Sequence, residues 1–325
     1  MLPAHQLHQQ NNIFNMKKIL LSAIAFIISL SVSAQDNRNF SVVLNPEVPK
    51  TITFADQKID LNRIDMWERL DRELTSLSYT HGSTLLTLKR ANRFFPLLAP
   101  ILKENGLPLD FLYLACTESM LDVRAYSPAK AAGLWQFIPA TGRSYGLEIN
   151  DYVDERLNIE KATVAACKYL KESYAKYGNW ESVACAYNAG NGRITSELSK
   201  QQVSSAFDLH LVSETSRYMF RILAYKMILE NPRNYGFYVT KDQLYQPIEC
   251  DIVEVNSAVS DWATWAKSHG ITYAQLREQN PWIQARYLKN ASGKVYQVKV
   301  PKKESLYRST QNKSVYNPTW IGKNR

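Results

Sequence analysis

The sequence predicts a mainly helical protein that ends in a small module of mixed helices and strands. Apolar residues recur every three or four positions through most of residues 63–236, which is the period of an amphipathic helix. Beyond Gly236 short β-branched stretches replace that period. The chain has 325 residues, which suits two modest domains or one large domain with extensions, and 45% of them are hydrophobic, enough to bury a core.

The first 34 residues carry the pattern of a signal peptide. Met16 is followed by two lysines, an uncharged apolar run over 19–32 and two small residues before Gln35. We therefore expect translation to start at Met16 and cleavage to fall just before Gln35. The apolar run is too short for a stable membrane span, and no cysteine lies at the cleavage point to anchor a lipoprotein. The mature chain is expected to be exported and soluble, and it loses two lysines, so its formal charge falls from +9 to +7.

The helical elements are predicted in chain order. Residues 35–62 contain two prolines and no helical period, so we expect an extended leader there. A stripe of apolar residues predicts a helix over 64–77, and another over 85–98 is expected to be interrupted by Pro96 and Pro100. Gly106 then stops that helix, and Pro108 opens the next one. Further helices are expected over 139–146, 158–177, 180–188 and 214–229.

The chain after Gly236 is predicted to form a second module over 237–301. Its elements are expected to be strands at 237–240, 252–255 and 295–300 and helices near 260–268 and 272–279. Residues 302–325 are basic and polar and contain a single tryptophan, Trp320, so they are predicted to be a loosely ordered tail.

The cysteines and histidines do not indicate a metal centre. The four cysteines have no metal-ligand spacing, and in an oxidising compartment they could form disulfides or stay as buried thiols. Both alternatives stay open for the set Cys116, Cys167, Cys185 and Cys250. The histidines beyond residue 34 lie far apart at positions 81, 210 and 269, so no metal is expected.

One carboxylate stands out. Glu118 comes at the end of an otherwise apolar helix, FLYLACTES. Burial disfavours its ionised form, and so does the negative end of the helix dipole. Both effects raise the pKa of Glu118, which suits a general acid, although a glutamate at a helix end is more often a solvated residue.

Two segments downstream supply the groups that a sugar chain needs. Trp135 and Gln136 follow small residues, and Tyr187 and Asn188 precede a glycine-rich stretch that we interpret as a loop. Aromatic rings stack on pyranose faces, and amides bond hydroxyl and N-acetyl groups. The alternative is that both aromatic residues belong to the core.

These motifs together resemble the catalytic domain of soluble lytic transglycosylases, specifically of the membrane-bound lytic murein transglycosylase D type. The resemblance runs from about residue 69 to 228. It rests on Glu118-Ser119, Gly133-Leu134-Trp135-Gln136, Ala186-Tyr187-Asn188-Ala189-Gly190 and Glu214-Thr215 with Tyr218. One departure is Trp135, where the family usually has methionine, and this change is expected to reshape a sugar subsite.

The resemblance implies a goose-type lysozyme-like helical domain that cleaves the β-1,4 bond between N-acetylmuramic acid and N-acetylglucosamine in peptidoglycan. Glu118 would protonate the glycosidic oxygen and then accept the proton of the muramoyl 6-hydroxyl, closing a 1,6-anhydro ring. By the same resemblance Ser119 and Tyr218 would orient Glu118 or the nearby sugar. Gln136 and Asn188 would hydrogen-bond the substrate, and Tyr187 would line the cleft. Neither a metal nor an organic cofactor is implied.

The second module is similar to a degenerate LysM repeat. The cues are two short helices around Gly270-Ile271, then Asn280-Pro281-Trp282 and a closing strand. LysM modules bind glycans containing N-acetylglucosamine, so the module could hold the enzyme on its polymer, and a purely structural role is the alternative. The family points to the periplasm of a Gram-negative bacterium, where a basic surface suits acidic wall polymers and nucleic acid is not expected as a partner.

Two other functions stay open at this stage. A true lysozyme would let water attack in place of the 6-hydroxyl, and Asp122 is the nearest second carboxylate. A local cap or a salt bridge with Arg124 is the alternative role for Asp122. A non-catalytic wall-binding protein is the third possibility, and the presence of Glu118 with Gln136 and Asn188 argues against it.

Overall fold

The structure is a computed structural model that describes residues 45–321. The predicted signal peptide and the first part of the predicted leader lie outside these residues. Within 45–321 there is no helix with both the length and the apolar character needed to cross a bilayer. The described part is mostly helical with two small sheets, which confirms the predicted fold class.

A β-hairpin opens the described chain. Strands β1 (Thr51–Phe54) and β2 (Gln57–Asp60) pair antiparallel, and the two turn residues Ala55 and Asp56 have φ of 49° and 62°. The Ala55 amide donates a 2.6 Å hydrogen bond to Asp110, which ties the turn to the helical unit. The prediction of an extended leader is therefore wrong for residues 51–60, because a turn without glycine gave no signal of a hairpin.

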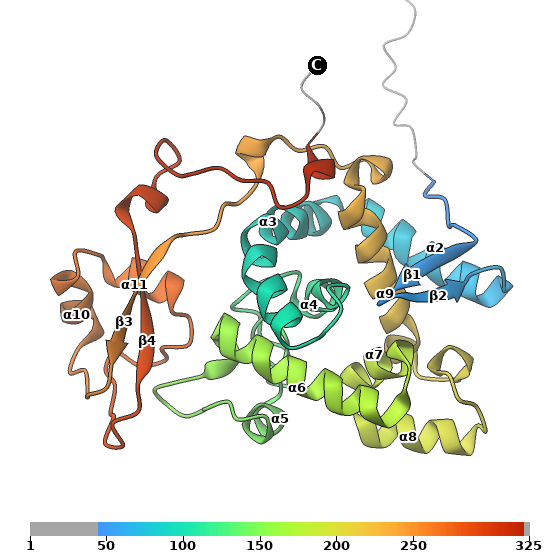
Figure 1. Ribbon diagram of the computed structural model, residues 1–325, viewed down its shortest axis with the longest axis horizontal. Coiled ribbons are helices and arrows are strands. Elements are labelled where there is room, and N and C mark those ends of the chain that lie inside the picture. Colours follow the sequence, from blue (N-terminus) through green and yellow to red (C-terminus); the bar gives the residue numbers. More distant parts are fainter. Residues whose placement is uncertain (1–44, 322–325) are drawn as a thin grey trace, which may run out of the picture. The chain divides into compact units, whose positions relative to one another are not determined.

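Helices make up the main body (Figure 1). Their bounds are α2 Ile64–Tyr79, α3 His81–Glu104, α4 Phe111–Ser119, α5 Pro139–Ser144, α6 Ile159–Tyr177, α7 Trp180–Ala189, α8 Asn191–Lys200 and α9 Ser213–Glu230. Short 3-10 turns lie at Glu155–Leu157, Ala206–Asp208, Pro232–Tyr235 and Lys241–Gln243. Helix α4 lies in the middle with α3, α6 and α9 around it, and Leu114, Ala115 and Cys116 are fully buried. A carboxylate at the end of α4 is therefore held by the most buried helix of this unit.

Helix α3 runs without interruption through both of its prolines. The predicted break at Pro96 and Pro100 is wrong, because the helix continues from His81 to Glu104. Each proline removes one backbone hydrogen bond, but Leu98 and Leu102 are fully buried on the same helix, and their burial offsets that loss. Gly106, at φ 69°, follows the helix end as predicted.

The predicted glycine-rich loop after Asn188 is a single-residue junction. Helix α7 ends at Ala189, Gly190 adopts φ 86°, and α8 begins at once with Asn191. A glycine at positive φ lets the chain change direction in one residue, because no Cβ clashes there. The loop prediction was wrong, and α8 was missed because it is short and contains only two apolar residues, Ile194 and Leu198.

The C-terminal module has the expected α+β content (Figure 1). Its elements are β3 Cys250–Val255, α10 Trp262–Ser268, α11 Tyr273–Gln279 and β4 Tyr296–Pro301, with β3 antiparallel to β4 from Cys250 opposite Pro301 to Val255 opposite Tyr296. Trp262, Leu276 and Val298 are fully buried in its core. The predicted strand at 237–240 does not form. Phe237 and Val239 pack against the helical core instead, without a partner strand.

The segment after β4 returns to the helical body. It contains short 3-10 turns at Lys303–Leu306 and Pro318–Trp320. Trp320 is 1% exposed, and its indole N–H donates to the backbone oxygen of Leu229 on α9. Asn92 on α3 donates to Ser314 O at 3.1 Å and accepts from the Tyr316 amide at 2.8 Å. The prediction of a loosely ordered tail is thus wrong for residues up to 321.

All four cysteines are unpaired thiols. Cys116, Cys167 and Cys185 are buried, and Cys250 is half-buried. Burial raises the pKa of Cys167 to about 11, so this thiol stays protonated near neutral pH. The structure therefore corresponds to the buried-thiol alternative. Within the described residues no cluster of three metal-ligating His, Cys, Asp or Glu side chains is found.

Candidate active site

Glu118 lies in the last turn of α4. The two residues that follow the helix, Met120 and Leu121, have φ of 52° and 55°, so the chain reverses direction directly after the carboxylate. The side chain of Glu118 is half-buried, and the hydroxyl of Tyr218 on α9 donates a hydrogen bond to its Oε1. The helix end and the tyrosine together fix the position of the carboxyl group.

Burial raises the pKa of Glu118 to about 7. The hydrogen bond from Tyr218 acts in the opposite direction because it favours the charged carboxylate. The nearby charge of Glu214 raises the pKa further, and Arg221 lowers it. The predicted upward shift is confirmed, and its main cause is loss of hydration. A carboxyl group with this pKa can carry a proton in a good fraction of molecules at neutral pH.

The Glu118 carboxyl faces a cavity of about 530 Å³. The walls come from the end of α4, the segment 127–141, α6, α7 and α9. The lining residues are Thr117, Glu118, Ser127, Ala129, Ala131, Gln136, Phe137, Ile138, Thr141, Tyr169, Tyr187, Asn188, Ala189, Gly190, Glu214, Tyr218 and Arg221. Five of the six predicted site residues are therefore brought together around one space: Glu118, Gln136, Tyr187, Asn188 and Tyr218.

Gln136 adopts a left-handed backbone conformation at φ 49°. Its side-chain nitrogen donates to the backbone oxygens of Ala125 at 3.1 Å and Gly133 at 2.9 Å. A non-glycine residue at positive φ persists when its surroundings hold it there. The two hydrogen bonds stabilise this conformation and fix the side-chain amide of Gln136 against the cavity wall.

Tyr187 and Asn188 come from the last turn of α7. The Tyr187 hydroxyl donates to the backbone oxygen of Trp135 at 2.8 Å, and burial together with the charge of Glu118 raises its pKa, so it stays protonated. Asn188 accepts from the Thr215 hydroxyl at 2.9 Å and donates to Glu214 at 3.4 Å. Helix α7 is thereby joined to the start of α9 at the edge of the cavity.

Ser119 and Trp135 do not line the cavity. The Ser119 hydroxyl is buried and donates to the backbone oxygens of Ala115 and Leu134, at 3.2 and 3.0 Å, and does not line the cavity. Trp135 is fully buried, and its indole N–H donates to the Thr163 hydroxyl at 2.9 Å. The expected effect of Trp135 on a sugar subsite is not seen, because its ring is part of the core. Only its backbone oxygen is linked to the cavity, by the hydrogen bond that Tyr187 donates to it.

Sequence reasoning gave no role to two charged residues of the cavity. Glu214 lay within a quoted motif. Glu214 precedes Tyr218 by four residues and Arg221 follows it by three, so all three lie on the same side of α9. That spacing was the available signal. Arg221 is held by Glu73 of α2, a buried carboxylate 3.4 Å from its Nε.

Asp122 does not line the cavity. Its carboxylate pairs with Arg90 at 3.1 Å and accepts a hydrogen bond from the Arg124 backbone amide at 3.0 Å. The guanidinium of Arg124 pairs with Glu278 instead, at 2.8 Å. The interpretation of Asp122 as a local cap and salt-bridge residue is confirmed, while the expected ion pair with Arg124 is wrong.

Two parts of the chain match known protein families. Residues 99–209 match the transglycosylase SLT domain family, and residues 251–304 match the soluble lytic transglycosylase C-terminal LysM-like domain. These matches fall within or overlap the predicted domains 63–236 and 237–301.

Individual proteins are similar to this chain over different lengths. Membrane-bound lytic murein transglycosylase D of Escherichia coli strain K12 is 31% identical over 243 residues, which are 73% of this chain and 52% of the relative. Peptidoglycan transglycosylase gp16 of Escherichia phage T7 is 36% identical over 122 residues, covering 37% of this chain and 9% of that protein. The crystal structure of the 70 kDa soluble lytic transglycosylase of Escherichia coli aligns with 42% of this chain and 24% of its own, at 25% identity and a TM-score of 0.35.

The chain spans about half the length of the murein transglycosylase D that it matches. The Glu118 cavity is built from residues inside the family match and from residues beyond its end, because α9 supplies Tyr218 and Arg221. The chain thus carries a transglycosylase SLT domain followed by a LysM-like domain of soluble lytic transglycosylases, and it is homologous to membrane-bound lytic murein transglycosylase D.

Proposed function

We propose that this protein is a peptidoglycan lytic transglycosylase. It would cleave the β-1,4 bond between N-acetylmuramic acid and N-acetylglucosamine without water and leave 1,6-anhydro ends. The observation that carries the proposal is the half-buried carboxyl of Glu118, with a pKa of about 7, facing a cavity lined by amides and aromatic rings. The SLT domain match supports the same reaction class.

In the first step Glu118 acts as the acid. Its protonated carboxyl gives a proton to the glycosidic oxygen, the bond from that oxygen to C1 of the muramoyl residue breaks, and N-acetylglucosamine leaves with a free 4-hydroxyl. Positive charge develops on the muramoyl ring. The Glu118 carboxylate formed in this step is then stabilised by the hydrogen bond from Tyr218 and by the positive charge of Arg221.

In the second step Glu118 acts as the base. The carboxylate accepts the proton of the muramoyl 6-hydroxyl, and O6 bonds to C1 to close the anhydro ring. The proton lent in the first step is thereby recovered, no water is consumed, and the enzyme returns to its starting state. A pKa near neutrality suits both halves of this cycle, because the group must give and take a proton with similar ease.

The remaining cavity residues bind and orient the substrate. Gln136 and Asn188 present amide groups to the sugar hydroxyl and N-acetyl groups, and Tyr187 contributes an aromatic surface. Tyr218 positions Glu118. We assign Ser119 a positioning role too, since its hydroxyl joins the end of α4 to the backbone of Leu134 beside the cavity.

Glu214 favours a second candidate function, a hydrolytic lysozyme. It lines the same cavity as Glu118 and is a second carboxylate, the group that a hydrolase needs to position water or form a covalent intermediate. Asp122 is not available for this role, because it pairs with Arg90 away from the cavity. The two candidates differ in whether Glu214 is required and in the mass of the product.

The deciding experiment is digestion of purified peptidoglycan followed by mass spectrometry of the released muropeptides. Products one water lighter than those of lysozyme, without reducing muramic acid ends, would support the transglycosylase. E118Q is expected to fold and to abolish release, whereas E214Q is the matched control and is expected to retain the anhydro product. Hydrated products that are lost in E214Q would establish the lysozyme, and an active, folded E118Q protein would overturn the site assignment.

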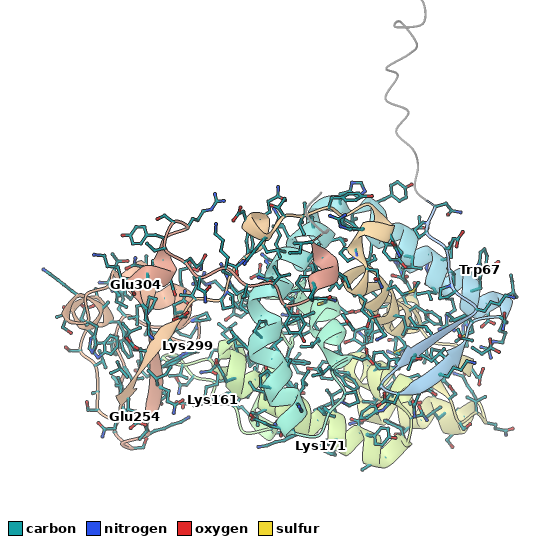
Figure 2. All side chains as sticks on the ribbon, turned by 45° about the horizontal axis from the view of Figure 1, so that its top comes forward. Trp67, Lys161, Lys171, Glu254, Lys299 and Glu304 are labelled. Carbon is teal, nitrogen blue, oxygen red and sulfur yellow. The ribbon has the colours of Figure 1, made fainter. Side chains whose placement is uncertain are left out.

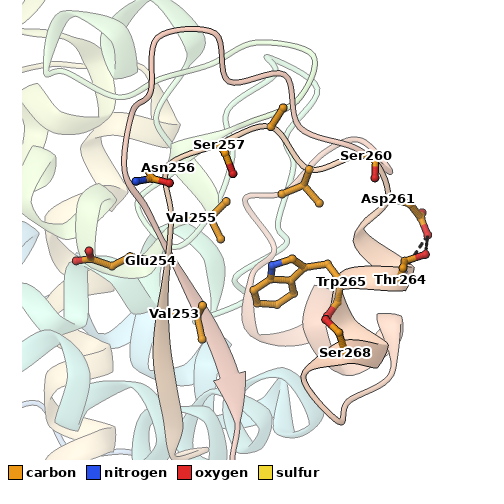
Figure 3. Close-up of a pocket in the computed structure, with 12 residues that line it drawn as sticks. Val253, Glu254, Val255, Asn256, Ser257, Ser260, Asp261, Thr264, Trp265 and Ser268 are labelled. Atoms are coloured by element: carbon orange, nitrogen blue, oxygen red, sulfur yellow. Dashed lines mark hydrogen bonds between the residues drawn. The ribbon is translucent and has the colours of Figure 1, made fainter.

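The C-terminal module offers a place for glycan binding beyond the catalytic cavity. Beside the β3–α10 connection lies a pocket of about 350 Å³ with polar side chains around a partly exposed tryptophan, Trp265 (Figure 3). The ring stacks on His269 at 3.8 Å between centroids. We propose that this pocket holds the wall polymer. Sedimentation with insoluble peptidoglycan tests it, because W265A should reduce the bound fraction of an E118Q protein, and unchanged sedimentation would assign the module a structural role.

We further propose that the protein is exported and acts in the periplasm. The motif over residues 1–34 and the relationship to murein transglycosylase D support this location. The N-terminal residue of the secreted protein, determined by sequencing, is expected to be Gln35.

A further inference from the structure

One arginine connects a buried ion pair to the wall of the catalytic cavity. Arg156 lies in the 3-10 turn Glu155–Leu157, and its side chain is 5% exposed. Its Nη1 donates to the backbone oxygens of Lys130 at 2.6 Å and Phe137 at 3.0 Å. These carbonyls lie at the two ends of the segment that contains Gln136, so one guanidinium holds both ends of that segment.

Asp154 holds the guanidinium in turn. Arg156 Nε donates to Asp154 Oδ1 at 2.9 Å, and Nη2 donates to Oδ2 at 2.7 Å, which is a two-point pairing between planar groups. The Asp154 side chain is 7% exposed. Because both partners are buried, removing one of them leaves the other as an unpaired charge without solvation, so the two residues must act as a unit.

The backbone between the two carbonyls is tightly packed. An added Cβ at Gly133 would lie 2.1 Å from the backbone oxygen of Arg156, and Gly133 has φ 78°. The amide of Ala132 donates to Phe137 O at 3.1 Å, closing the turn that presents Gln136. Gln136 and Phe137 line the cavity from this turn. The backbone of this turn therefore packs directly on the segment that carries Arg156.

The C-terminal module contacts the segment that carries Asp154 and Arg156. The Asp154 amide donates to Trp282 O at 2.9 Å, and the Gln284 amide donates to Tyr152 O at 2.8 Å, forming a short bridge across Val153. Lys294 adds ion pairs to Glu148 at 2.5 Å and Glu155 at 3.0 Å. Lys299 of β4 makes a further contact with α6, an ion pair with Glu160 at 2.5 Å. Lys299 and the neighbouring Lys161 of α6 are both labelled in Figure 2 and line one pocket.

We propose that Asp154 and Arg156 are positioning residues through which the C-terminal module fixes the cavity wall at 130–137. This inference rests on the proposed function, because the wall carries the substrate-binding Gln136. The module is then part of the catalytic architecture, whatever glycan it binds itself. The effect falls on substrate binding and leaves the acid untouched, since neither residue contacts Glu118 in the described structure.

The first test is hydrogen exchange of the wall amides, which needs no substrate. D154N should speed exchange at Ala132 and Gly133 by about tenfold or more, because the guanidinium loses its two-point anchor. The matched control is D110N, which disrupts another ion pair of low exposure, with Lys226 at 2.5 Å, away from the cavity lining. It should leave the exchange of the wall unchanged.

The second test is binding of the tetrasaccharide of N-acetylglucosamine to the E118Q protein, measured by calorimetry. D154N should weaken binding by about tenfold, the loss expected when one hydrogen bond between the wall and the sugar is misaligned. In the active protein D154N should raise KM more than it lowers kcat, with the alkaline limb of the pH profile unmoved. K294M, which disrupts the module side alone and is less prone to unfold, should change exchange and binding in the same direction by a smaller factor.

Each outcome bears on one proposal. Unchanged wall exchange in folded D154N and K294M would overturn the positioning role, and a change in D154N without one in K294M would overturn the part assigned to the module. If exchange rises as expected but the E118Q protein binds no tetrasaccharide and the wild type releases no muropeptide, the proposed function fails while the positioning role of Asp154 and Arg156 stands.

Discussion

The hydroxyl of Tyr218 on α9 donates a hydrogen bond to Oε1 of Glu118 on α4. This contact favours the charged form of the carboxyl, while burial favours the neutral form, and burial is the larger effect. The pKa of about 7 is therefore a balance between two opposing influences that come from different helices.

Removing the Tyr218 hydroxyl should shift that balance. In Y218F the carboxylate loses its donor, so the pKa of Glu118 rises further above its ordinary value, and the alkaline limb of kcat/KM moves to higher pH. The pH profile measured on soluble glycan strands checks this. Y225F is a suitable control, because Tyr225 is buried on the same helix and does not line the cavity. A limb that moves to lower pH would contradict the assigned balance.

Glu118 should also give the protein a pH-dependent stability. Its pKa is raised from 4.5 to about 7 in the folded state, so the fold favours the protonated form. That stabilisation is complete below pH 4.5 and is lost as pH rises to about 7, by on the order of 1 to 3 kcal/mol. Urea unfolding at pH 5 and pH 8 measures it. The difference between the two pH values should shrink by this amount in E118Q, and an unchanged difference would argue against a raised pKa.

Trp135 should behave as a core residue. W135F removes the indole hydrogen bond to Thr163, whose hydroxyl still donates to Ile159 O, so we expect a loss of about 1 to 2 kcal/mol in the free energy of unfolding. Tetrasaccharide binding to an E118Q protein should be the same with either residue. A large loss of affinity without loss of stability would instead return Trp135 to a sugar subsite.

Trp320 should contribute strongly to stability although it lies near the end of the chain. W320A leaves a cavity beside Leu229 and Phe95, and truncation of a buried tryptophan costs about 3 to 5 kcal/mol. Y307A is the matched control, since Tyr307 belongs to the same returning segment and is 56% exposed. It should change stability by no more than about 0.5 kcal/mol. Equal effects of the two variants would contradict the buried position.

The sequence was informative where one local signal decides the structure. Apolar periods located α6, α7 and α9, and a carboxylate on an apolar helix identified Glu118 together with the direction of its pKa shift. The motif order also placed Gln136 and Asn188 at the cavity, although the positive φ of Gln136 and its hydrogen bonds to the backbone oxygens of Ala125 and Gly133 are visible only in the structure.

The sequence was misleading where tertiary packing decides. Helix α3 continues through two prolines because its buried face outweighs their local preference, and Trp320 looked isolated because its partners lie about 90 residues or more earlier in the chain. Glu214 shares the cavity with Glu118 only through the packing of α9 on α4, which no local pattern records.

The return of residues 302–321 to the helical body changes how the C-terminal module is connected. Trp320 is anchored on α9 and Tyr316 on α3. The module is therefore connected to the helical body at both of its ends, as an insertion would be. It cannot swing outward on one hinge as a terminal appendage would. A protease cut in the connection around 241–249 would accordingly leave two fragments that stay together and co-elute, with the cavity still assembled.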